Sequence, residues 1–283
     1  IILSMNTLNC RGCLIDVRTP SIMGIINVNN DSFYMKSRHD THASILASAA
    51  KMLNEGATIL DLGGVSTRPN ASSISVQTEL DRVIPAIDHI KQSFPDSIIS
   101  IDTFNPEVAA NAIDVGASII NDITAGGIDD EMLHLAKEKN CTYIMMHMQG
   151  TPQTMQINPS YKDVVLEILD FFIEKVGKAK AIGLHDLVID PGFGFGKTIT
   201  HNYQLLNGLH VFNILDKPLL AGISRKGMLW KPLNSSPEEV LPASIAANLV
   251  ALQKGAKILR VHDVEATMQL LKTFELLQQN NVK

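Results

Sequence analysis

The stretch Ser97-Ile-Ile-Ser-Ile-Asp102 is a short apolar run that stops at a carboxylate. Seven further runs of this kind recur along the chain, and each carries or meets a polar residue: Ile22–Val28 with Asn27, Ala57–Leu62 with Asp61, Ser118–Ile120 before Asn121 and Asp122, Thr142–Met146 before His147, Asp186–Ile189 before Asp190, Pro218–Ile223 before Ser224, and Lys257–Leu259 before Arg260 and His262. Eight buried strands that present polar groups from the same end predict a (β/α)8 TIM barrel, with its active site at the C-terminal ends of the strands.

Segments with helical periodicity separate these runs. They are Thr41–Glu55, Thr78–Phe94, Pro106–Val115, Asp129–Lys139, Tyr161–Ile182, His201–Leu215, Pro237–Lys254 and Asp263–Gln279. Alternating strands and helices favour a parallel sheet of the α/β class, because parallel strands need long crossover connections. A doubly wound open sheet is the alternative. It would concentrate function near one switch point, whereas here every strand end carries a polar group.

The composition predicts one domain over residues 1–283, since 45% of the residues are hydrophobic and no linker or low-complexity stretch divides the chain. The net charge of −5 gives no reason to expect nucleic acid or a membrane surface as a partner. No apolar run approaches the roughly 20 residues that span a bilayer.

Three cysteines suit a reducing cytoplasm better than a disulfide scaffold. Cys10-Arg-Gly-Cys13 has the CxxC spacing of metal and redox sites, but the chain has no second CxxC. We favour a turn between two short strands, Thr7–Cys10 and Cys13–Val17, forming an N-terminal hairpin that closes the bottom of the barrel. Ile1–Ser4 lacks the features of a secretory signal, and we expect it to lie upstream of the functional protein.

The densest motif is Asp190-Pro-Gly-Phe-Gly-Phe-Gly-Lys197. Its glycines let backbone approach a ligand, and its two Phe side chains can supply apolar walls. It is not a phosphate loop of the GxxxxGK type, because Pro191 stands where Gly is needed, and Lys197 breaks GxGxxG. Asp190 could simply cap a loop, but the motif as a whole favours a ligand clamp.

Asp102, Asn121 and Asp190 are expected to point into the barrel mouth. Two carboxylates and an amide suit an amino-substituted, nitrogen-rich heterocycle, because a carboxylate accepts two parallel N–H bonds and an amide both donates and accepts. The same oxygen ligands also suit Mg²⁺ or Ca²⁺, and the sequence leaves that choice open.

A basic cluster follows the last two strands: Arg225, Lys226, Arg260 and His262. These positions often bind phosphate in barrels, so we expect the ligand to carry an anionic group there. His147 either lines the site or is a neutral structural histidine. The chain has no GxSxG elbow and no HExxH, so we expect binding and electrostatics, not covalent or zinc chemistry, to perform the reaction.

Taken in order, the motifs resemble those of the dihydropteroate synthase family over nearly the whole chain. They are Met23–Val28 with Asp31-Ser-Phe33, Gly63-Gly64 with Ser66–Pro69, Ile101–Thr103, Ile120–Ile123, Met146–Pro152, Asp190–Lys197, Gly222–Lys226 and Arg260–Val264. The resemblance implies an enzyme of folate biosynthesis, a transferase that joins 6-hydroxymethyl-7,8-dihydropterin diphosphate to 4-aminobenzoate and releases diphosphate and 7,8-dihydropteroate. It further implies a Mg²⁺ cofactor, sulfonamide inhibitors and a homodimer.

The resemblance also assigns site residues. Asp102, Asn121, Asp190 and Lys226 would hold the pterin ring, and Met146 would line the substrate site. Asn27, Arg260 and His262 would hold the diphosphate, with Mg²⁺ at Asn27 beside Asp31. Phe33, Thr67, Arg68, Pro69, Phe195 and Gly227 would surround the aminobenzoate. Of these, Asp31, Arg68, Lys226, Arg260 and His262 are expected to act in catalysis. The long segments Asn29–Asp40 and Gly63–Gln77 would close over the substrates.

The chain departs from the family pattern at four places. Asn29-Asn30 replaces Thr-Pro, Val65 replaces Glu, Phe104-Asn105 replaces Ser-Lys, and Gly227 replaces Ser. Losing the serine hydroxyl predicts weaker aminobenzoate binding. Two alternatives follow. A non-catalytic pterin-binding module is suggested by the changed first loop, and a methyltetrahydrofolate-binding methyltransferase barrel shares pterin recognition. The basic cluster argues against the second, because a methyl-transfer site has no diphosphate to hold.

Overall fold

The structure is a computed structural model that describes residues 7–28, 38–65, 74–127 and 129–280. Eight parallel strands close into a barrel in the order β10-β3-β4-β5-β6-β7-β8-β9. They are β3 (Ser21–Asn27), β4 (Ile59–Gly63), β5 (Ile98–Asp102), β6 (Ile119–Asp122), β7 (Thr142–Met146), β8 (Leu187–Asp190), β9 (Leu219–Ala221) and β10 (Ala256–Val261). The predicted (β/α)8 barrel is confirmed, and the open-sheet alternative is wrong.

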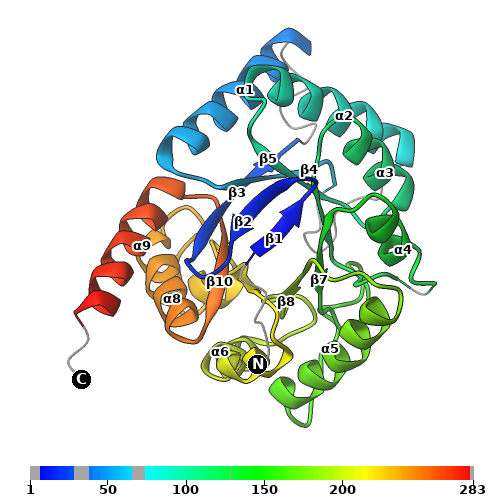
Figure 1. The fold of residues 1–283 in the computed structure, drawn as a ribbon. Helices are drawn as coiled ribbons and strands as arrows, with labels where there is room; N and C mark the ends of the chain where they lie inside the picture. Colours follow the sequence, from blue (N-terminus) through cyan, green and yellow to red (C-terminus); the bar gives the residue numbers. More distant parts are fainter. Residues whose placement is uncertain (1–6, 29–37, 66–73, 128, 281–283) are drawn as a thin grey trace.

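Helices surround the barrel (Figure 1). They are α1 (Arg38–Glu55), α2 (Val76–Ser93), α3 (Pro106–Asp114), α4 (Glu131–Glu138), α5 (Val164–Ala181), α6 (Ile199–Asn207), α7 (Gly227–Trp230), α8 (Leu241–Gln253) and α9 (Val264–Gln279). Side-chain caps set several starts: Asn105 Oδ1, for example, accepts from the backbone N–H groups of Glu107 and Val108 at the start of α3.

Two helical predictions differ from the structure. The segment predicted as one helix over His201–Leu215 divides at Gly208 into α6 and a 3₁₀ helix, Leu209–Leu215. A Cβ at Gly208 would lie 2.7 Å from Val165 Cγ2, so the glycine lets the chain pass close to α5. Near the C-terminus, α8 begins at Leu241 instead of Pro237, and the short helix α7 was not predicted.

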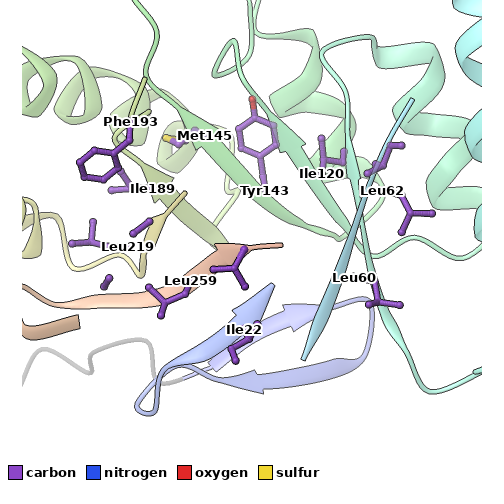
Figure 2. Close-up of a cluster of buried hydrophobic side chains, with 14 of the residues drawn as sticks. Ile22, Leu60, Leu62, Ile120, Tyr143, Met145, Ile189, Phe193, Leu219 and Leu259 are labelled. Atoms are coloured by element: carbon purple, nitrogen blue, oxygen red, sulfur yellow. The ribbon is translucent and has the colours of Figure 1, made fainter. Parts of the chain in front are cut away.

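The alternation of side chains along the strands builds two separate cores. Figure 2 shows outward-facing residues such as Leu60, Tyr143 and Ile189, which belong to the cluster that packs the barrel against its helices. Their sequence neighbours Ile59, Ile144 and Val188 instead belong to a second cluster inside the barrel. This period-2 alternation leaves the inward positions nearer the strand ends for polar residues.

The N-terminal hairpin completes the inner core. Strands β1 (Thr7–Cys10) and β2 (Cys13–Asp16) pair antiparallel, and Leu8, Cys10, Ile15 and Val17 join the inner cluster. Figure 1 shows the hairpin lying across one end of the barrel. The turn residues Arg11 and Gly12 both have positive φ, at 53° and 93°, as a two-residue hairpin turn requires.

Contacts with the barrel hold this hairpin in place. Thr142 Oγ1 donates to Asn9 O at 3.0 Å, and Asn9 N donates to Asp186 Oδ1 at 2.8 Å. Burial raises the pKa of the Cys10 thiol to about 11, so this cysteine is a poor nucleophile and a poor metal ligand. The predicted structural role of the CxxC segment therefore agrees with the geometry.

A Leu8→Ala substitution tests whether the hairpin closes the base of the barrel and so stabilises the fold. Leu8 is fully buried, and its truncation should lower the free energy of unfolding by about 2–5 kcal/mol. Leu14→Ala in the same hairpin is the matched control, since Leu14 is 64% exposed and should change stability by less than about 0.5 kcal/mol. Urea titrations measure both. Equal effects would contradict this role.

Candidate active site

The inward-facing residues at the C-terminal ends of the strands are polar. Gly63 is in register with Asp102, Asp102 with Asn121, and Met146 with Asp190. Asn121 is in register with Ile144, two residues before Met146, so the four residues do not share one level. The predicted pterin-site residues Asp102, Asn121, Met146 and Asp190 nevertheless all lie near the C-terminal ends of neighbouring strands, at the barrel mouth. Two glycines on this face leave room there: a Cβ at Gly222 would meet Lys226, Asp190 and Arg260 at 3.7–3.9 Å, and one at Gly63 would meet Asp102 at 3.5 Å.

Arg260 is held by two carboxylates. Its Nε donates to Asp61 Oδ2 at 2.6 Å, and its Nη2 donates to Asp102 Oδ2 at 2.5 Å. Burial alone would lower the pKa of the guanidinium, but the two neighbouring carboxylates raise it above its usual value. Arg260 was assigned to the diphosphate and Asp102 to the ring, and the structure brings the two together.

Asp61 is a site residue that the sequence analysis did not assign. Its side chain is fully buried, and it accepts from Asn121 Nδ2 at 3.2 Å as well as from Arg260. The bond orients the Asn121 amide, so that its oxygen points away from Asp61. The signal for Asp61 was its position two residues before Gly63, because residues two apart on a strand share a face.

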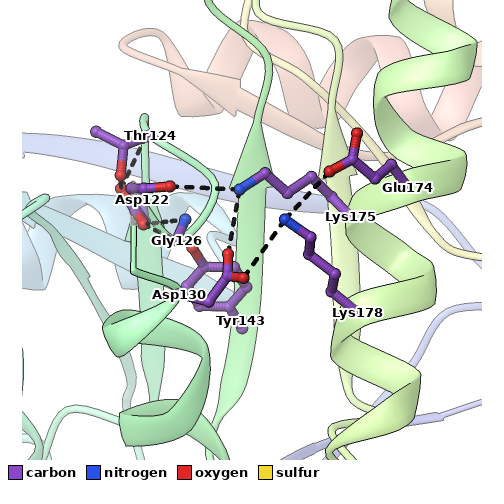
Figure 3. Close-up of polar contacts among 9 residues, drawn as sticks. Asp122, Thr124, Gly126, Asp130, Tyr143, Glu174, Lys175 and Lys178 are labelled. Carbon is purple, nitrogen blue, oxygen red and sulfur yellow. Dashed lines mark hydrogen bonds and ion pairs between the residues drawn. The ribbon is translucent and has the colours of Figure 1, made fainter.

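The segment after β6 is fixed by Asp122, which faces away from the site. Asp122 accepts from Tyr143 Oη at 2.6 Å, from Gly126 N at 2.9 Å and from the backbone and hydroxyl of Thr124 at 2.8 and 2.7 Å. Figure 3 shows this network, which continues to Asp130, Lys175 and Lys178 on the outside of the barrel. The bonds to Asp122 itself hold the strand end that carries Asn121, whereas Lys175 and Lys178 contact Asp130.

Lys226 and Phe195 meet at the other side of the mouth. The Lys226 ammonium donates to Phe193 O and lies 4.7 Å from the centre of the Phe195 ring. Burial lowers the pKa of Lys226 to about 8, while Asp190 opposes that shift. Asp190 Oδ1 accepts from Gly192 N at 2.8 Å, so the carboxylate is also tied to the Gly-rich segment.

The predicted basic cluster is only partly correct. Arg225 does not face the mouth; it forms a two-point ion pair with Asp263, at 3.0 Å from Nε and 2.5 Å from Nη2. Its left-handed backbone, with φ of 57°, turns its side chain toward α9. Ser224, which was not assigned, contacts His262 Nδ1 through its hydroxyl at 3.1 Å. These two contacts tie the segment after β9 to the segment after β10.

His147 was expected either to line the site or to be a neutral structural histidine. The structure supports the second role. It is 8% exposed, contacts Lys197 Nζ through Nδ1 at 3.0 Å, and packs edge-on against Phe171. Burial lowers its pKa to about 3, so its ring is neutral.

Asn27 is exposed at the end of β3, beside Gly63. Gly227 is the first residue of α7. Five assigned residues, Asp31, Phe33, Thr67, Arg68 and Pro69, lie outside the described residues, as do Asn29 and Asn30. Within the described part of the chain, no group of three or more His, Cys, Asp or Glu side chains could hold a metal ion. No described helix is long and apolar enough to cross a membrane.

Comparison with known proteins identifies the family of the chain. Residues 23–262 match the family described as pterin binding enzyme, which makes the chain a pterin-binding barrel enzyme. Dihydropteroate synthase of Escherichia coli K12 is 43% identical over 267 residues, which cover 94% of each chain. The chain belongs to the dihydropteroate synthase family and is a transferase.

Two solved structures share the fold closely. Yersinia pestis dihydropteroate synthase, in complex with a sulfonamide drug, superposes with a TM-score of 0.90 at 39% identity and covers 96% of this chain and 99% of its own. Xanthomonas albilineans dihydropteroate synthase with 4-aminobenzoic acid also has a TM-score of 0.90, at 38% identity and with 98% and 99% coverage.

The ionisation of Asp102 and Lys226 predicts a bell-shaped pH profile of kcat/KM for the pterin substrate. Burial raises the pKa of Asp102 to about 7, against the effect of Arg260, so Asp102 carries its charge above that pH. Lys226 keeps its charge below about pH 8. Both charges coexist between these values, and activity should fall on either side. Steady-state assays from pH 5.5 to 9.5 measure this. A flat profile would contradict the assignment.

Proposed function

We propose that this chain condenses 6-hydroxymethyl-7,8-dihydropterin diphosphate with 4-aminobenzoate, giving 7,8-dihydropteroate and diphosphate in folate biosynthesis. The observation that carries the proposal is that Asp102, Asn121 and Asp190 lie near the C-terminal ends of β5, β6 and β8, while Lys226 and Asp190 border the space left by Gly222. Carboxylates there accept the paired N–H groups of the pterin pyrimidine edge, and the Asn121 amide and Lys226 reach its other polar atoms.

The diphosphate would lie at the ends of β3 and β10, against Asn27, Arg260 and His262. Arg260 is charged at all relevant pH values, and Ser224 fixes the imidazole of His262 through Nδ1. These groups stabilise the charge that develops on the departing diphosphate.

Asn27 is exposed at the end of β3, and its amide oxygen would be the protein ligand of Mg²⁺. Proteins usually bind Mg²⁺ by one or two oxygen ligands, together with waters and substrate phosphates, so a site completed by the diphosphate needs few protein ligands. When bound, Mg²⁺ would neutralise charge on the leaving group.

The reaction needs no protein nucleophile. Departure of the diphosphate leaves positive charge on the pterin methylene, and the dihydropterin ring delocalises that charge. The amine of 4-aminobenzoate then forms the new C–N bond and loses a proton. The buried carboxylates Asp102 and Asp190 stabilise the cationic ring electrostatically. We expect Asp31, Phe33, Thr67, Arg68 and Pro69 to close over the substrates and exclude water, the competing nucleophile.

The aminobenzoate would lie beside Phe195 and Gly227. A structure of the Yersinia pestis relative holds a sulfonamide drug, and we infer that sulfonamides bind this chain in the same region. The homodimer, the cytoplasmic location and the single domain over residues 1–283 stay predictions.

A coupled assay for diphosphate release tests the function. We expect release only when pterin diphosphate, 4-aminobenzoate and Mg²⁺ are all present, and we expect omission of any one, or addition of EDTA, to abolish it. Calorimetric titration with 6-hydroxymethylpterin measures binding independently. Pterin binding without turnover would identify a non-catalytic binding module, and methyl transfer from methyltetrahydrofolate would identify the methyltransferase alternative. Either result would overturn the proposal.

A Gly227→Ser substitution tests the aminobenzoate site. The added hydroxyl should bind the aminobenzoate carboxylate and lower the KM for 4-aminobenzoate by about three- to tenfold. The structure accommodates the change, because the new Cβ would meet only the flexible Lys231 side chain, at 3.3 Å or more. Gly177→Ser on α5 is the control, since a Cβ there meets nothing within 4 Å. An unchanged or higher KM in the Gly227 variant would contradict this assignment.

A further inference from the structure

Lys197 ends the Gly-rich motif, yet the proposed reaction does not use it. Its side chain is buried, with 3% exposed, and its Nζ donates to Gly192 O at 2.9 Å and Phe195 O at 3.0 Å and contacts His147 Nδ1 at 3.0 Å. A longer contact reaches His147 O at 3.4 Å. An ammonium has three N–H donors, so these acceptors saturate it.

The backbone between residues 192 and 196 points its carbonyls in two directions. The carbonyls of Gly192 and Phe195 face Lys197, whereas the carbonyl of Phe193 faces Lys226. Positive φ at Gly192, Gly194 and Gly196, of 73°, 83° and 62°, makes this reversal possible. Lys197 and Lys226 thus bind opposite sides of one short loop.

Further contacts hold the outer edge of this loop. Gly194 N donates to Asn202 Oδ1 at 2.7 Å, Gln156 Nε2 donates to Gly194 O at 2.7 Å, and Tyr161 Oη donates to Gly196 O at 2.8 Å. Every carbonyl from Gly192 to Gly196 therefore has a donor, as buried backbone requires. Lys197 is the donor to Phe195 O, and it shares Gly192 O with the backbone N–H of Phe195, which lies 3.1 Å from that oxygen.

The groups around Lys197 shift its pKa in opposite directions. Burial lowers its pKa to about 7, Asp190 opposes that shift, and Lys226 adds to it. The neutral imidazole of His147 supplies an acceptor at Nδ1, so its proton is on Nε2. Three acceptors around Nζ favour the ammonium form, which alone can donate to all of them.

We propose that Lys197 is a positioning residue for the pterin subsite: it folds the 192–196 loop so that the Phe193 carbonyl orients Lys226 and the Gly192 N–H orients Asp190. This role rests on the proposed function, because it serves the two groups that hold the pterin ring. Lys197 itself does not touch the substrate. In this proposal the Gly-rich motif binds the ligand through Asp190 and Lys226, and Lys197, on the other side of the loop, holds these two side chains in position.

Lys197→Met in the chain of residues 1–283 tests the proposal, since Met keeps the approximate length of the side chain and removes all three donors. The KM for pterin diphosphate should rise about tenfold, the equivalent of one or two lost hydrogen bonds, while the KM for 4-aminobenzoate changes less than about twofold. Calorimetric titration with 6-hydroxymethylpterin should show the same loss of affinity. In a Lys226→Met background the further effect of Lys197→Met should disappear, because the two residues act through one loop.

Lys175→Met is the matched control. Like Lys197, Lys175 donates to a backbone carbonyl, Gly127 O at 3.4 Å, and it contacts Asp130 Oδ1 at 3.2 Å, but it lies on the outside of the barrel (Figure 3). Its loss should leave both KM values unchanged. The proposal is overturned if Lys197→Met leaves pterin affinity unchanged, raises both KM values equally, or has its full effect without Lys226.

A measurement on the unmodified protein covers the case in which Lys197→Met does not fold. Histidine ¹⁵N NMR should show His147 with a proton on Nε2 and none on Nδ1 between pH 6 and 8. A charged ring, or a proton on Nδ1, would overturn the proposal. If the unmodified chain binds 6-hydroxymethylpterin but does not turn over, the proposed reaction fails, while the calorimetric comparison still decides the role of Lys197.

Discussion

Three carboxylates and two cations share the inside of the barrel mouth, where ion pairs between them offset the cost of burying charge. Asp61 is fully buried and pairs with Arg260, which also pairs with Asp102. On the other side Asp190 faces Lys226. Removing one partner of such a pair leaves an uncompensated buried charge, which costs about 3–5 kcal/mol. The ring subsite and the diphosphate subsite are therefore one electrostatic unit, joined by Arg260.

The apolar half of the barrel makes this charged half possible. The hairpin and the lowest inward layer close the base with hydrophobic side chains, and the outward-facing residues pack the helices. Both layers fix the register of the strands, so that the polar positions above them converge on the mouth. The segment after β8 is then tied to the segment after β7 by Lys197 and His147, and the segment after β9 is tied to the segment after β10 by Arg225 and Asp263.

Most of the fold could be predicted because strand ends carry a local signal, an apolar run that stops at a polar residue. Asp61 was missed since its run continues to Leu62, which hides the residue within the strand. Arg225 was misplaced because its partner Asp263 lies far away in sequence. The same holds for Lys197 and His147, 50 residues apart, whose contact no local pattern reveals. Gly208 resembled a tolerated helical glycine, and only its contact with Val165 explains the break.

The most direct test of this account is a crystal structure with a pterin diphosphate analogue, Mg²⁺ and an aminobenzoate analogue. The account predicts that the pterin ring contacts Asp102, Asn121, Asp190 and Lys226, that Arg260 keeps its bond to Asp61, and that the diphosphate lies against Asn27 and His262. A pterin ring bound away from Asp190 and Lys226, or an Arg260 side chain that leaves Asp61, would contradict it.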